Sequence, residues 1–526
     1  MGVVPRSLRA RVAAAVLSGV LLGLCFPNAS LVVLLPVALV PLLLALDDLR
    51  PGRAALLGGL FGVAFWLTTF PWIYHVVHRF GGLPAPLAAV ALLLAAVVPS
   101  VPMAAMTALV ALAVPRSMAA RILVFPAAWV VQELVRTYAF SGFPWALISY
   151  PLAPWPLLTQ TAALGGAALT SLLVVFVNAA LAEAVRGKGR QRVGGLAVAA
   201  AVVAVSVATG AARLSRPEVF SPGKELRVLI VQPNIEQDVR TAPGTAERIH
   251  FDVTGLTRAL LRKAPSDLVL WPESATLLAW PWSEGFRQEI TRLCREEGTA
   301  LLFNTVWSDR PSDDDAPYFN SALLVDGNGV VGEPYHKLRL VPFGEYVPLR
   351  ALFRWVPQLS QAVPGAFTPG TKAIPLELSG VRLGGAICYE VVYPWIVRAQ
   401  VAAGADALYT LTNDAWYGDG GAQEQHFQAA VFRAVETGRP MLRAAVTGIS
   451  GWIDGRGRTL ARLGPGARAG IAGRLRVPPR DSRTLAGLLG DAVPIVCAAA
   501  LLVAILRARA SARRSPPMSD QKGPLP

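Results

Sequence analysis

The stretch Gly384-Gly385-Ala386-Ile387-Cys388-Tyr389-Glu390 decides the fold of the second half of this chain. Residues 381–387 form a largely apolar run that is typical of a buried strand, and a cysteine follows it directly. A segment that begins with Pro394 follows, and its composition predicts a helix over 394–403. A cysteine at the turn between a strand and a helix has its sulfur accessible for reaction rather than packed in the core. A lone cysteine is more often a small apolar core residue, so its role depends on the rest of the chain.

Strand-like and helix-like segments alternate on both sides of this cysteine turn. Short runs rich in leucine or β-branched residues predict strands at 226–232, 268–271, 300–305, 321–326, 381–387 and 407–412. Between them, the sequence predicts helices at 245–263, 283–297 and 423–437. This alternation over residues 213–483 predicts a separate domain with an α/β or α-β-β-α layered fold. A domain of that length buries its own core.

The other segments are too apolar for an ordinary soluble protein. The chain has 53% hydrophobic residues and a mean hydropathy of +0.46. A membrane-spanning helix needs about 20 apolar residues. Candidate spans lie at 10–26, 30–47, 54–75, 86–114, 119–137, 158–184, 193–212 and 484–506. The first two are short and joined by a tight turn, which predicts a helical hairpin, and no clear cleavage site follows the first.

These spans divide the chain into four parts. Residues 1–212 are expected to form transmembrane helices one to seven, and residues 484–506 the eighth. Residues 213–483 form the layered domain between them. The tail 507–526 is basic and rich in proline and serine, so we expect it to be disordered.

Basic residues between the spans predict the orientation of the chain. Sixteen lysines and arginines fall at the N-terminus, in alternate loops and in the C-terminal tail, all on one side of the predicted membrane. The loops of the other side contain only Arg79. The positive-inside rule therefore places both termini in the cytoplasm and residues 213–483 outside it. The net charge of +15 is then largely a topology signal, and we expect no nucleic-acid partner.

Three short segments of the outer domain contain residues suited to acyl transfer. Glu273 follows a predicted strand and a proline, and Cys388 ends another strand. Lys337 and Glu345 share one apolar segment punctuated by proline. Each of these residues alone indicates little. A lysine among apolar residues, for example, usually extends its ammonium to solvent. Together they supply a thiolate nucleophile at Cys388, a general base at Glu273 and an oxyanion-stabilising ammonium at Lys337.

The strings around these residues are similar to those of a known superfamily. WPES, YHKLRLVPFGEYVP, GGAICYE and TNDAWYGD resemble motifs of the nitrilase, or carbon–nitrogen hydrolase, superfamily. With seven spans before the domain and one after it, residues 10–506 resemble the apolipoprotein N-acyltransferase family in particular. The resemblance implies a nitrilase-type α-β-β-α sandwich. It assigns a Glu-Lys-Cys triad to Glu273, Lys337 and Cys388, an assisting role to Glu345, and positions lining the site to Tyr389, Glu390 and Trp416.

The resemblance also implies the reaction and its partners. A membrane phospholipid would donate an acyl chain to Cys388, and the α-amino group of a diacylglyceryl-cysteine at an apolipoprotein N-terminus would accept it. No metal or cofactor is implied, and the location is the bacterial inner membrane with a periplasmic catalytic domain. The chain departs from the family pattern at Val446 and Thr447, where paired asparagines are expected. These departures concern substrate fitting more than the triad.

Three other functions compete with this interpretation. A membrane-tethered amidase, with water as the acceptor, would use the same triad. A transporter with a large outer domain is disfavoured because the spans contain few charges and no clear inverted repeat. An inactive binding domain is disfavoured by the intact set of Glu273, Lys337 and Cys388. The eight spans favour a lipidic substrate.

A few further features carry expectations. The apolar arm 347–367 could be core or a lid that dips into the lipid surface. Glu133 and Arg136, near the outer end of the fifth span, are expected to pair with each other because charges are costly there. His426 invites a Cys-His dyad, but we favour a polar residue at the start of a helix.

Overall fold

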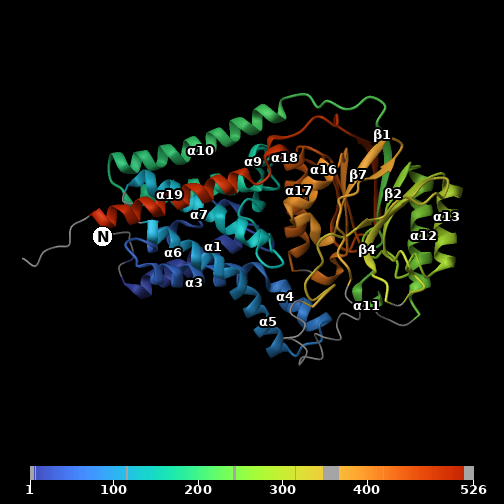
Figure 1. The fold of residues 1–526 in the computed structure, drawn as a ribbon, viewed down its shortest axis with the longest axis horizontal. Helices are drawn as coiled ribbons and strands as arrows, with labels where there is room; N and C mark the ends of the chain where they lie inside the picture. The colour runs from blue at the N-terminus through green and yellow to red at the C-terminus, as the bar shows by residue number, and fades with distance from the viewer. Residues whose placement is uncertain are drawn as a thin grey trace, which may run out of the picture.

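The computed structural model describes residues 5, 7–113, 117–240, 244–313, 315–347, 367–418 and 420–514. A bundle of long helices and a β-sandwich lie end to end (Figure 1). The start of α1 (Leu8–Leu24) and the end of α19 (Ala492–Arg514) both lie at the end of the bundle that is far from the sandwich. The sandwich is therefore an insertion between helices of the bundle.

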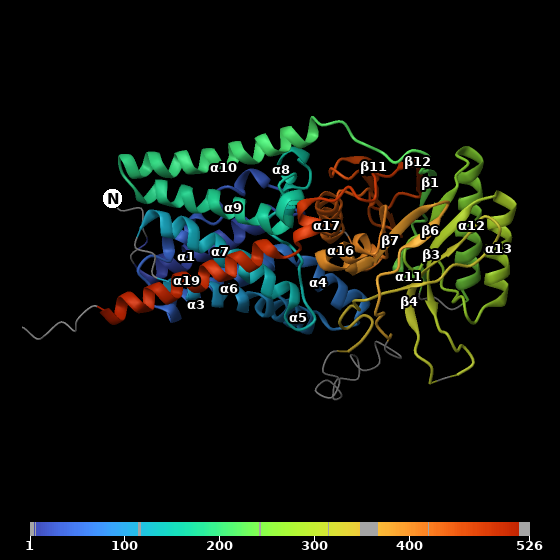
Figure 2. The ribbon, with the colours of Figure 1, turned by 45° about the horizontal axis from the view of Figure 1, so that its top comes forward.

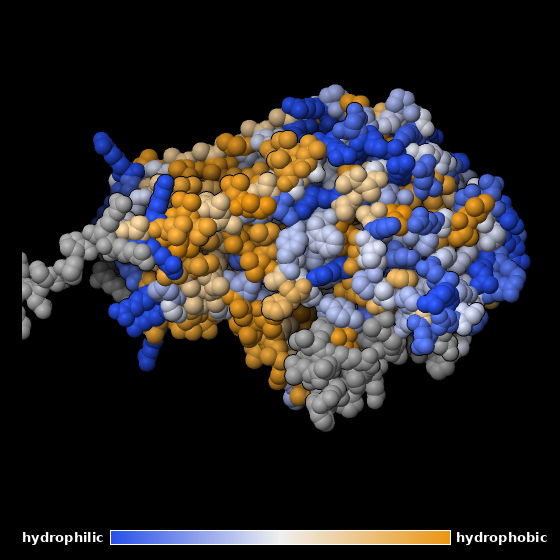
Figure 3. Space-filling view, in the orientation of Figure 1, coloured by the Kyte–Doolittle hydropathy of each residue, from blue (hydrophilic) through white to orange (hydrophobic). Residues whose placement is uncertain are grey.

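Six helices of the described chain are long and apolar enough to cross a membrane. They are α3 (Pro51–Thr69), α5 to α6 (Ala85–Ala113), α7 (Met118–Tyr138), α9 (Ala162–Arg186), α10 (Arg190–Leu214) and Ala492–Ala510 of α19. The first two expected spans correspond to α1, with 17 residues, and to a broken segment that includes α2 (Val40–Ala45). The side surface of the bundle is largely hydrophobic, and hydrophilic residues gather at its far end (Figure 3). The chain thus contains a multi-pass membrane region.

The sandwich consists of two six-stranded sheets. The first has the order β12-β1-β2-β3-β4-β5, with β1, β2 and β3 parallel. Its strands are β1 (Glu225–Gln232), β2 (Leu268–Leu270), β3 (Ala300–Trp307), β4 (Phe319–Val325), β5 (Tyr335–His336) and β12 (Ala469–Arg476). The second has the order β11-β10-β9-β8-β7-β6, with β7, β8 and β9 parallel. Its strands are β6 (Leu376–Leu378), β7 (Val381–Ile387), β8 (Ala407–Thr412), β9 (Met441–Ala445), β10 (Ser450–Ile453) and β11 (Thr459–Leu463).

Alternating apolar side chains in the strands build the layers. Along β1, Val228 and Ile230 pack against the second sheet, whereas Leu229 and Val231 pack against helices. The helices on that outer face are α12 (Ala246–Lys263) and α13 (Glu284–Glu297). On the other side, α16 (Pro394–Ala402) and α17 (Ala422–Thr437) lie between the second sheet and the membrane bundle (Figure 2). The predicted α-β-β-α sandwich is confirmed.

The second helical layer and the membrane bundle share one apolar core. Phe427 and Phe432 of α17 belong to the same buried cluster as Phe61 and Trp66 of α3. Polar contacts also cross the boundary, since Glu436 Oε1 accepts a hydrogen bond from the Ala167 backbone N–H, at 2.6 Å, where α9 is kinked. The sandwich is therefore packed directly on the membrane region.

The predicted strands and helices agree closely with the structure. The predicted strands 381–387 and 407–412 have the bounds of β7 and β8, and α17 begins one residue before the predicted helix 423–437. The short strands β5 and β6, and the strands β9 to β12, were not predicted.

One expectation is wrong: among the described residues, Glu133 and Arg136 form no ion pair. Glu133 Oε1 accepts hydrogen bonds from Trp129 Nε1 and the Ile148 N–H, both at 3.0 Å. Arg136 instead donates to Gln132 Oε1 and the Trp145 carbonyl. The turn after α7 folds back on the helix, so each charge finds local partners. Residues 348–366 of the apolar arm 347–367 lie outside the described residues.

Candidate active site

Strand ends from both sheets converge on one site. Cys388 directly follows β7 and begins the short 3-10 turn Cys388–Val392, and Thr412 ends the neighbouring strand β8. From the first sheet, Glu273 follows β2 and Lys337 follows β5. The Cys388 backbone has φ = 51°, in the left-handed region that non-glycine residues rarely adopt. Strain of this kind is typical of a side chain that a strand-to-helix turn holds out for chemistry.

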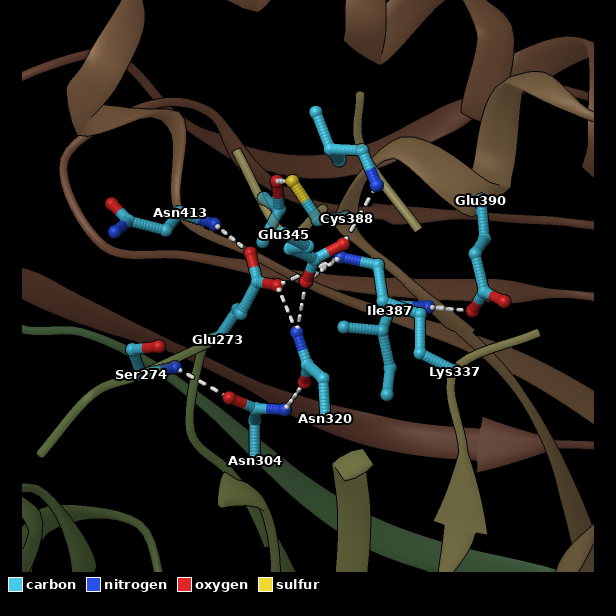
Figure 4. Close-up of polar contacts among 12 residues, drawn as sticks. Glu273, Ser274, Asn304, Asn320, Lys337, Glu345, Ile387, Cys388, Glu390 and Asn413 are labelled. Atoms are coloured by element: carbon cyan, nitrogen blue, oxygen red, sulfur yellow. Dashed lines mark hydrogen bonds and ion pairs between the residues drawn. The ribbon is translucent and has the colours of Figure 1, made fainter. Parts of the chain in front are cut away.

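Lys337 lies between two carboxylates. Its Nζ donates to Glu273 Oε1 at 3.1 Å and to Glu345 Oε1 at 2.9 Å. Asn320 of β4 braces the same pair, because its Nδ2 donates to Glu273 Oε1 at 3.1 Å and to Glu345 Oε1 at 2.6 Å. Figure 4 shows these side chains pointing toward one another beside Cys388. The four predicted residues are thus brought together, although they come from distant parts of the sequence.

A tight turn positions Glu345. The Glu345 backbone N–H donates to the Val341 carbonyl at 2.9 Å, and the Val341 N–H donates back to Glu345 Oε2 at 2.8 Å. Phe343, inside this turn, has a φ of 63°. Only 9% of Glu345 is exposed, so its carboxylate faces Lys337 rather than solvent.

Burial and charge together set the protonation states of the site. Burial would raise the pKa of Glu273, but the Lys337 ammonium and the Asn320 amide hold it below its usual value. Burial would lower the pKa of Lys337, but Glu273 and Glu345 raise it overall. Burial and then the Glu273 charge raise the pKa of the Cys388 thiol. The resting site therefore contains a carboxylate, an ammonium and a neutral thiol.

A second buried network lies behind the sulfur. Thr412 Oγ1 is 3.3 Å from Cys388 Sγ and 2.8 Å from Asp414 Oδ1. Arg443 Nη2 donates to Asp414 Oδ2 at 2.7 Å. His426 lies with Nδ1 3.1 Å from Asp414 Oδ1 and Nε2 3.1 Å from the Cys388 carbonyl oxygen. All four of these side chains around Cys388 are fully buried.

His426 lies near the start of α17, as expected of a polar residue there, but it is fully buried and does not form a Cys-His dyad. Its hydrogen-bond contact is with the backbone carbonyl of Cys388 and not with Sγ. Since a carbonyl oxygen only accepts, Nε2 carries a proton and donates it. Burial lowers the pKa of His426, and the Arg443 charge lowers it further. This histidine holds the main chain of the cysteine turn.

Glu390 is a backbone anchor. It is fully buried, and its Oε1 accepts from the Leu338 N–H at 2.6 Å and the Arg339 N–H at 3.1 Å. Its Oε2 accepts from the Ile387 N–H at 2.7 Å. In Figure 4 this carboxylate lies against Ile387, to one side of the cluster around Lys337. Glu390 thus ties the segment that carries Lys337 to the turn that carries Cys388.

The two aromatic residues that the resemblance places around the site differ in their exposure and in their neighbours. Tyr389 is 7% exposed, and its ring stacks on Trp145 of the membrane region at a centroid distance of 6.0 Å. Trp416 is 41% exposed and meets Phe80 edge to face at 5.5 Å. Among the described residues, neither side chain forms a hydrogen bond or ion pair with Glu273, Glu345 or Lys337.

Sequence reasoning missed several residues of this site. Asn320 lies inside the strand FNSALLV, where no local signal separates a functional asparagine from a structural one. Trp145 lies in a loop whose aromatic residues are typical of a membrane interface. Thr412 and Asp414 lie in the string TNDAWYGD, and that string was the available signal. Within the described chain, no group of three or more His, Cys, Asp or Glu side chains is placed to hold a metal ion.

The fold and the motifs place the sandwich in a known class. Residues 228–473 match the family described as carbon-nitrogen hydrolase. A solved amidase from Nesterenkonia sp. is 21% identical and covers 50% of this chain and 95% of its own, with a TM-score of 0.37. The family match over residues 228–473, together with the two-sheet architecture, makes the sandwich a carbon-nitrogen hydrolase domain.

The membrane region specifies the family. Residues 18–180 match the apolipoprotein N-acyltransferase N-terminal domain. The apolipoprotein N-acyltransferase of Geobacter metallireducens is 33% identical over 510 residues, covering 95% of both chains. That of Azotobacter vinelandii is 34% identical over 484 residues, covering 90% of this chain and 91% of its own. This chain belongs to the apolipoprotein N-acyltransferase family and is an acyltransferase.

Proposed function

We propose that this chain transfers a fatty acyl group from a membrane phospholipid to the α-amino group of the diacylglyceryl-cysteine at an apolipoprotein N-terminus. The transfer passes through a thioester on Cys388. The observation that carries the proposal is the buried cluster beside Cys388, in which Lys337 Nζ donates to Glu273 Oε1 at 3.1 Å and to Glu345 Oε1 at 2.9 Å. This arrangement lies in a sandwich packed on membrane helices, where both lipid substrates are within reach.

In the first half-reaction, Cys388 attacks the ester carbonyl of the phospholipid. Its thiol proton moves to Glu273 as the sulfur–carbon bond forms, because the thiol pKa is too high for a free thiolate to accumulate. Collapse of the tetrahedral intermediate breaks the ester carbon–oxygen bond. Glu273 then gives its proton to the departing oxygen, and a lysophospholipid leaves.

In the second half-reaction, the lipoprotein amine attacks the thioester. Glu273 takes a proton from the amine nitrogen, the carbon–sulfur bond breaks, and the sulfur regains a proton as the amide product forms. In both steps Lys337 supplies charge to the developing oxyanion. Two of its three N–H donors meet Glu273 and Glu345, which leaves the third for the substrate oxygen. Glu345 keeps the ammonium charged and oriented.

The supporting residues act through position. Glu390 fixes the distance between the Lys337 segment and the cysteine turn through its three backbone hydrogen bonds to Ile387, Leu338 and Arg339. Tyr389 connects the turn to the membrane region through Trp145. We assign Trp416, exposed beside Phe80, to the entrance used by lipid.

The proposed placement is a bacterial inner membrane with the sandwich in the periplasm. We propose eight spans, seven within residues 1–212 and one within 484–506, with the layered domain 213–483 between them and the tail 507–526 in the cytoplasm. The bias of basic residues toward one side supports this orientation. So does the position of the start of α1 and the end of α19 at the end of the bundle far from the sandwich.

A labelling experiment tests the proposal. Purified protein in vesicles is incubated with a phospholipid that carries a radiolabelled acyl chain. We expect label on the protein that hydroxylamine releases and that Cys388→Ser lacks. A diacylated lipopeptide should then discharge the label into a triacylated product. We expect Glu273→Gln and Lys337→Ala each to reduce labelling by about 10²-fold or more.

Two outcomes would overturn the proposal. If label never appears on the wild-type protein, the thioester does not form from phospholipid. If water discharges the label as fast as the lipopeptide does, the chain is a membrane-tethered amidase rather than a transferase. Wild-type labelling rates in Glu273→Gln or Lys337→Ala would refute the roles given to those residues.

A further inference from the structure

Thr412 has a contact that the Glu-Lys-Cys chemistry leaves unused. It is the last residue of β8, and its hydroxyl oxygen lies 3.3 Å from Cys388 Sγ. The same oxygen lies 2.8 Å from Asp414 Oδ1. Thr412 is fully buried, so no solvent competes for these contacts. A hydroxyl has one proton and two lone pairs, so it donates a hydrogen bond to one of the two neighbours and presents a lone pair to the other.

The charge on Asp414 determines which neighbour receives the proton at rest. Burial would raise the pKa of Asp414, but the Arg443 guanidinium and His426 hold it well below its usual value. An ionised carboxylate only accepts hydrogen bonds. In the resting site, therefore, the Thr412 hydroxyl donates to Asp414 and turns a lone pair toward the neutral thiol.

The sulfur needs a donor when it becomes negatively charged. Lys337 Nζ is engaged by two carboxylates, and the Glu273 carboxylate is an acceptor. Among the described side chains, the donor in hydrogen-bond contact with Sγ is the Thr412 hydroxyl. Arg443 already compensates the Asp414 charge at 2.7 Å, so Asp414 tolerates the loss of one hydrogen bond when the hydroxyl turns.

We propose that Thr412 is a further catalytic residue, whose hydroxyl rotates to donate a hydrogen bond to Cys388 Sγ whenever the sulfur carries negative charge. This occurs as the thiol proton moves to Glu273 and again as the carbon–sulfur bond of the thioester breaks. The Thr412 proton stays on its own oxygen throughout. Glu273 still carries the transferred proton, so the proton balance of each half-reaction is unchanged.

The strand offers a matched pair of substitutions. Thr412→Val keeps the shape and removes the hydroxyl, whereas Thr412→Ser keeps the hydroxyl. Thr410, two residues earlier on the same strand, is also fully buried, but its Oγ1 has no hydrogen-bond partner in the described chain. Thr410→Val is therefore the control for removing a threonine hydroxyl from β8.

Two kinds of readout apply. The first is the rate of each half-reaction, label uptake from phospholipid and discharge by lipopeptide, and this arm rests on the proposed function. The second is the rate at which iodoacetamide alkylates Cys388 as a function of pH, which needs no lipid substrate. A failure of the proposed function would remove the first readout and leave the second intact. The other cysteines, Cys25, Cys294 and Cys497, are replaced by alanine in all variants, so that alkylation reports Cys388 alone.

We expect Thr412→Val to slow both half-reactions about tenfold or more, because a hydrogen bond to a charged group is lost. Its alkylation profile should shift upward by about one pH unit, since a tenfold change in thiolate stability is one pKa unit. The KM for phospholipid should not change. Thr412→Ser should stay within about threefold of the parent protein, and Thr410→Val should match the parent.

Three results would overturn the proposal. One is a Thr412→Val protein whose rates and alkylation profile match the parent. Another is an equal loss in Thr410→Val, which would show a general effect of the strand. The third is an equal loss in Thr412→Ser, which would show that the methyl group matters rather than the hydroxyl. If Thr412→Val does not fold, Thr412→Ala with the same readouts decides the question.

Discussion

Trp145 of the membrane region and Tyr389 of the sandwich stack with ring centroids 6.0 Å apart and ring planes 21° apart. Tyr389 directly follows Cys388 in the chain. Trp145 Nε1 also donates to Gln425 Oε1 at 2.7 Å, and Gln425 Nε2 donates to the Pro27 carbonyl at 2.8 Å. The membrane region thus supplies one wall of the cysteine turn, and the geometry of the cysteine depends on it.

Replacing Trp145 should therefore impair both the fold and the chemistry. We expect Trp145→Ala to cost about 3–5 kcal/mol, because a buried tryptophan is removed. Label uptake on Cys388 should fall about tenfold or more, because the cysteine turn loses its packing. The lost stack with Tyr389 accounts for part of the loss in stability. Thermal unfolding and label uptake measure the two effects. Trp155→Ala, at a side chain that is 44% exposed, is the control and should change neither. Equal effects in both variants would contradict the special role of Trp145.

We expect Asn320 to set the acid limit of activity. Its amide donates to both Glu273 and Glu345, and this helps to keep the pKa of Glu273 below the ordinary 4.5. As pH falls through that pKa, Glu273 gains a proton and stops acting as a base. We expect Asn320→Ala to move the acid limb of the label-uptake profile upward by about one pH unit. Asn328→Ala, in an exposed turn, should leave the limb in place. An unchanged limb in Asn320→Ala would refute this explanation.

The sequence predicted the layers well because local patterns dictate them. Buried parallel strands such as β7 and β8 are largely apolar in sequence, and their ends are marked by Cys388 and by the Asn413–Asp414 pair. The proposed triad residues could be named because each follows a strand in a recognisable string. These signals are local, and the structure brought the predicted residues together.

The parts of the site that the sequence did not predict depend on contacts between distant segments. Asn320 becomes a brace only when β4 lies beside Glu273, and Trp145 becomes part of the site only when the membrane loop packs on α17. Glu133 and Arg136 have the spacing of a helical pair, yet the turn after α7 offers each a closer partner. Periodicity along one helix carries no information on such partners.

Gly385, in the motif before Cys388, leaves room for two tyrosines. A Cβ at this position would lie 2.3 Å from the Tyr409 Oη and 2.9 Å from the Tyr335 ring. We expect Gly385→Ala to destabilise the protein by about 1–3 kcal/mol through overpacking. Denaturant unfolding measures this cost. Gly255→Ala on α12, where a Cβ would meet nothing within 4 Å, should be neutral or stabilising. A Gly385→Ala protein as stable as the parent would show that the sheets separate easily here.

Glu390 provides the last prediction, because its carboxylate spans the two halves of the site. Oε1 accepts from the Leu338 and Arg339 N–H groups, and Oε2 accepts from the Ile387 N–H. A glutamine has one acceptor oxygen, so Glu390→Gln places an amide N–H₂ against a backbone donor on one side. We expect a loss of about 1–3 kcal/mol in stability, since a buried N–H is left unsatisfied.

The catalytic effect of Glu390→Gln should appear in kcat and not in KM. Lys337 and Cys388 lose the tie that fixes their separation, and misplaced groups slow the chemical step about 10²-fold. Steady-state kinetics with phospholipid and lipopeptide separate the two parameters. Glu377→Gln makes the same chemical change at an exposed ion pair with Arg382 and should leave kcat unchanged. If Glu390→Gln raised KM for phospholipid at constant kcat, Glu390 would act in lipid binding instead of holding the two segments together.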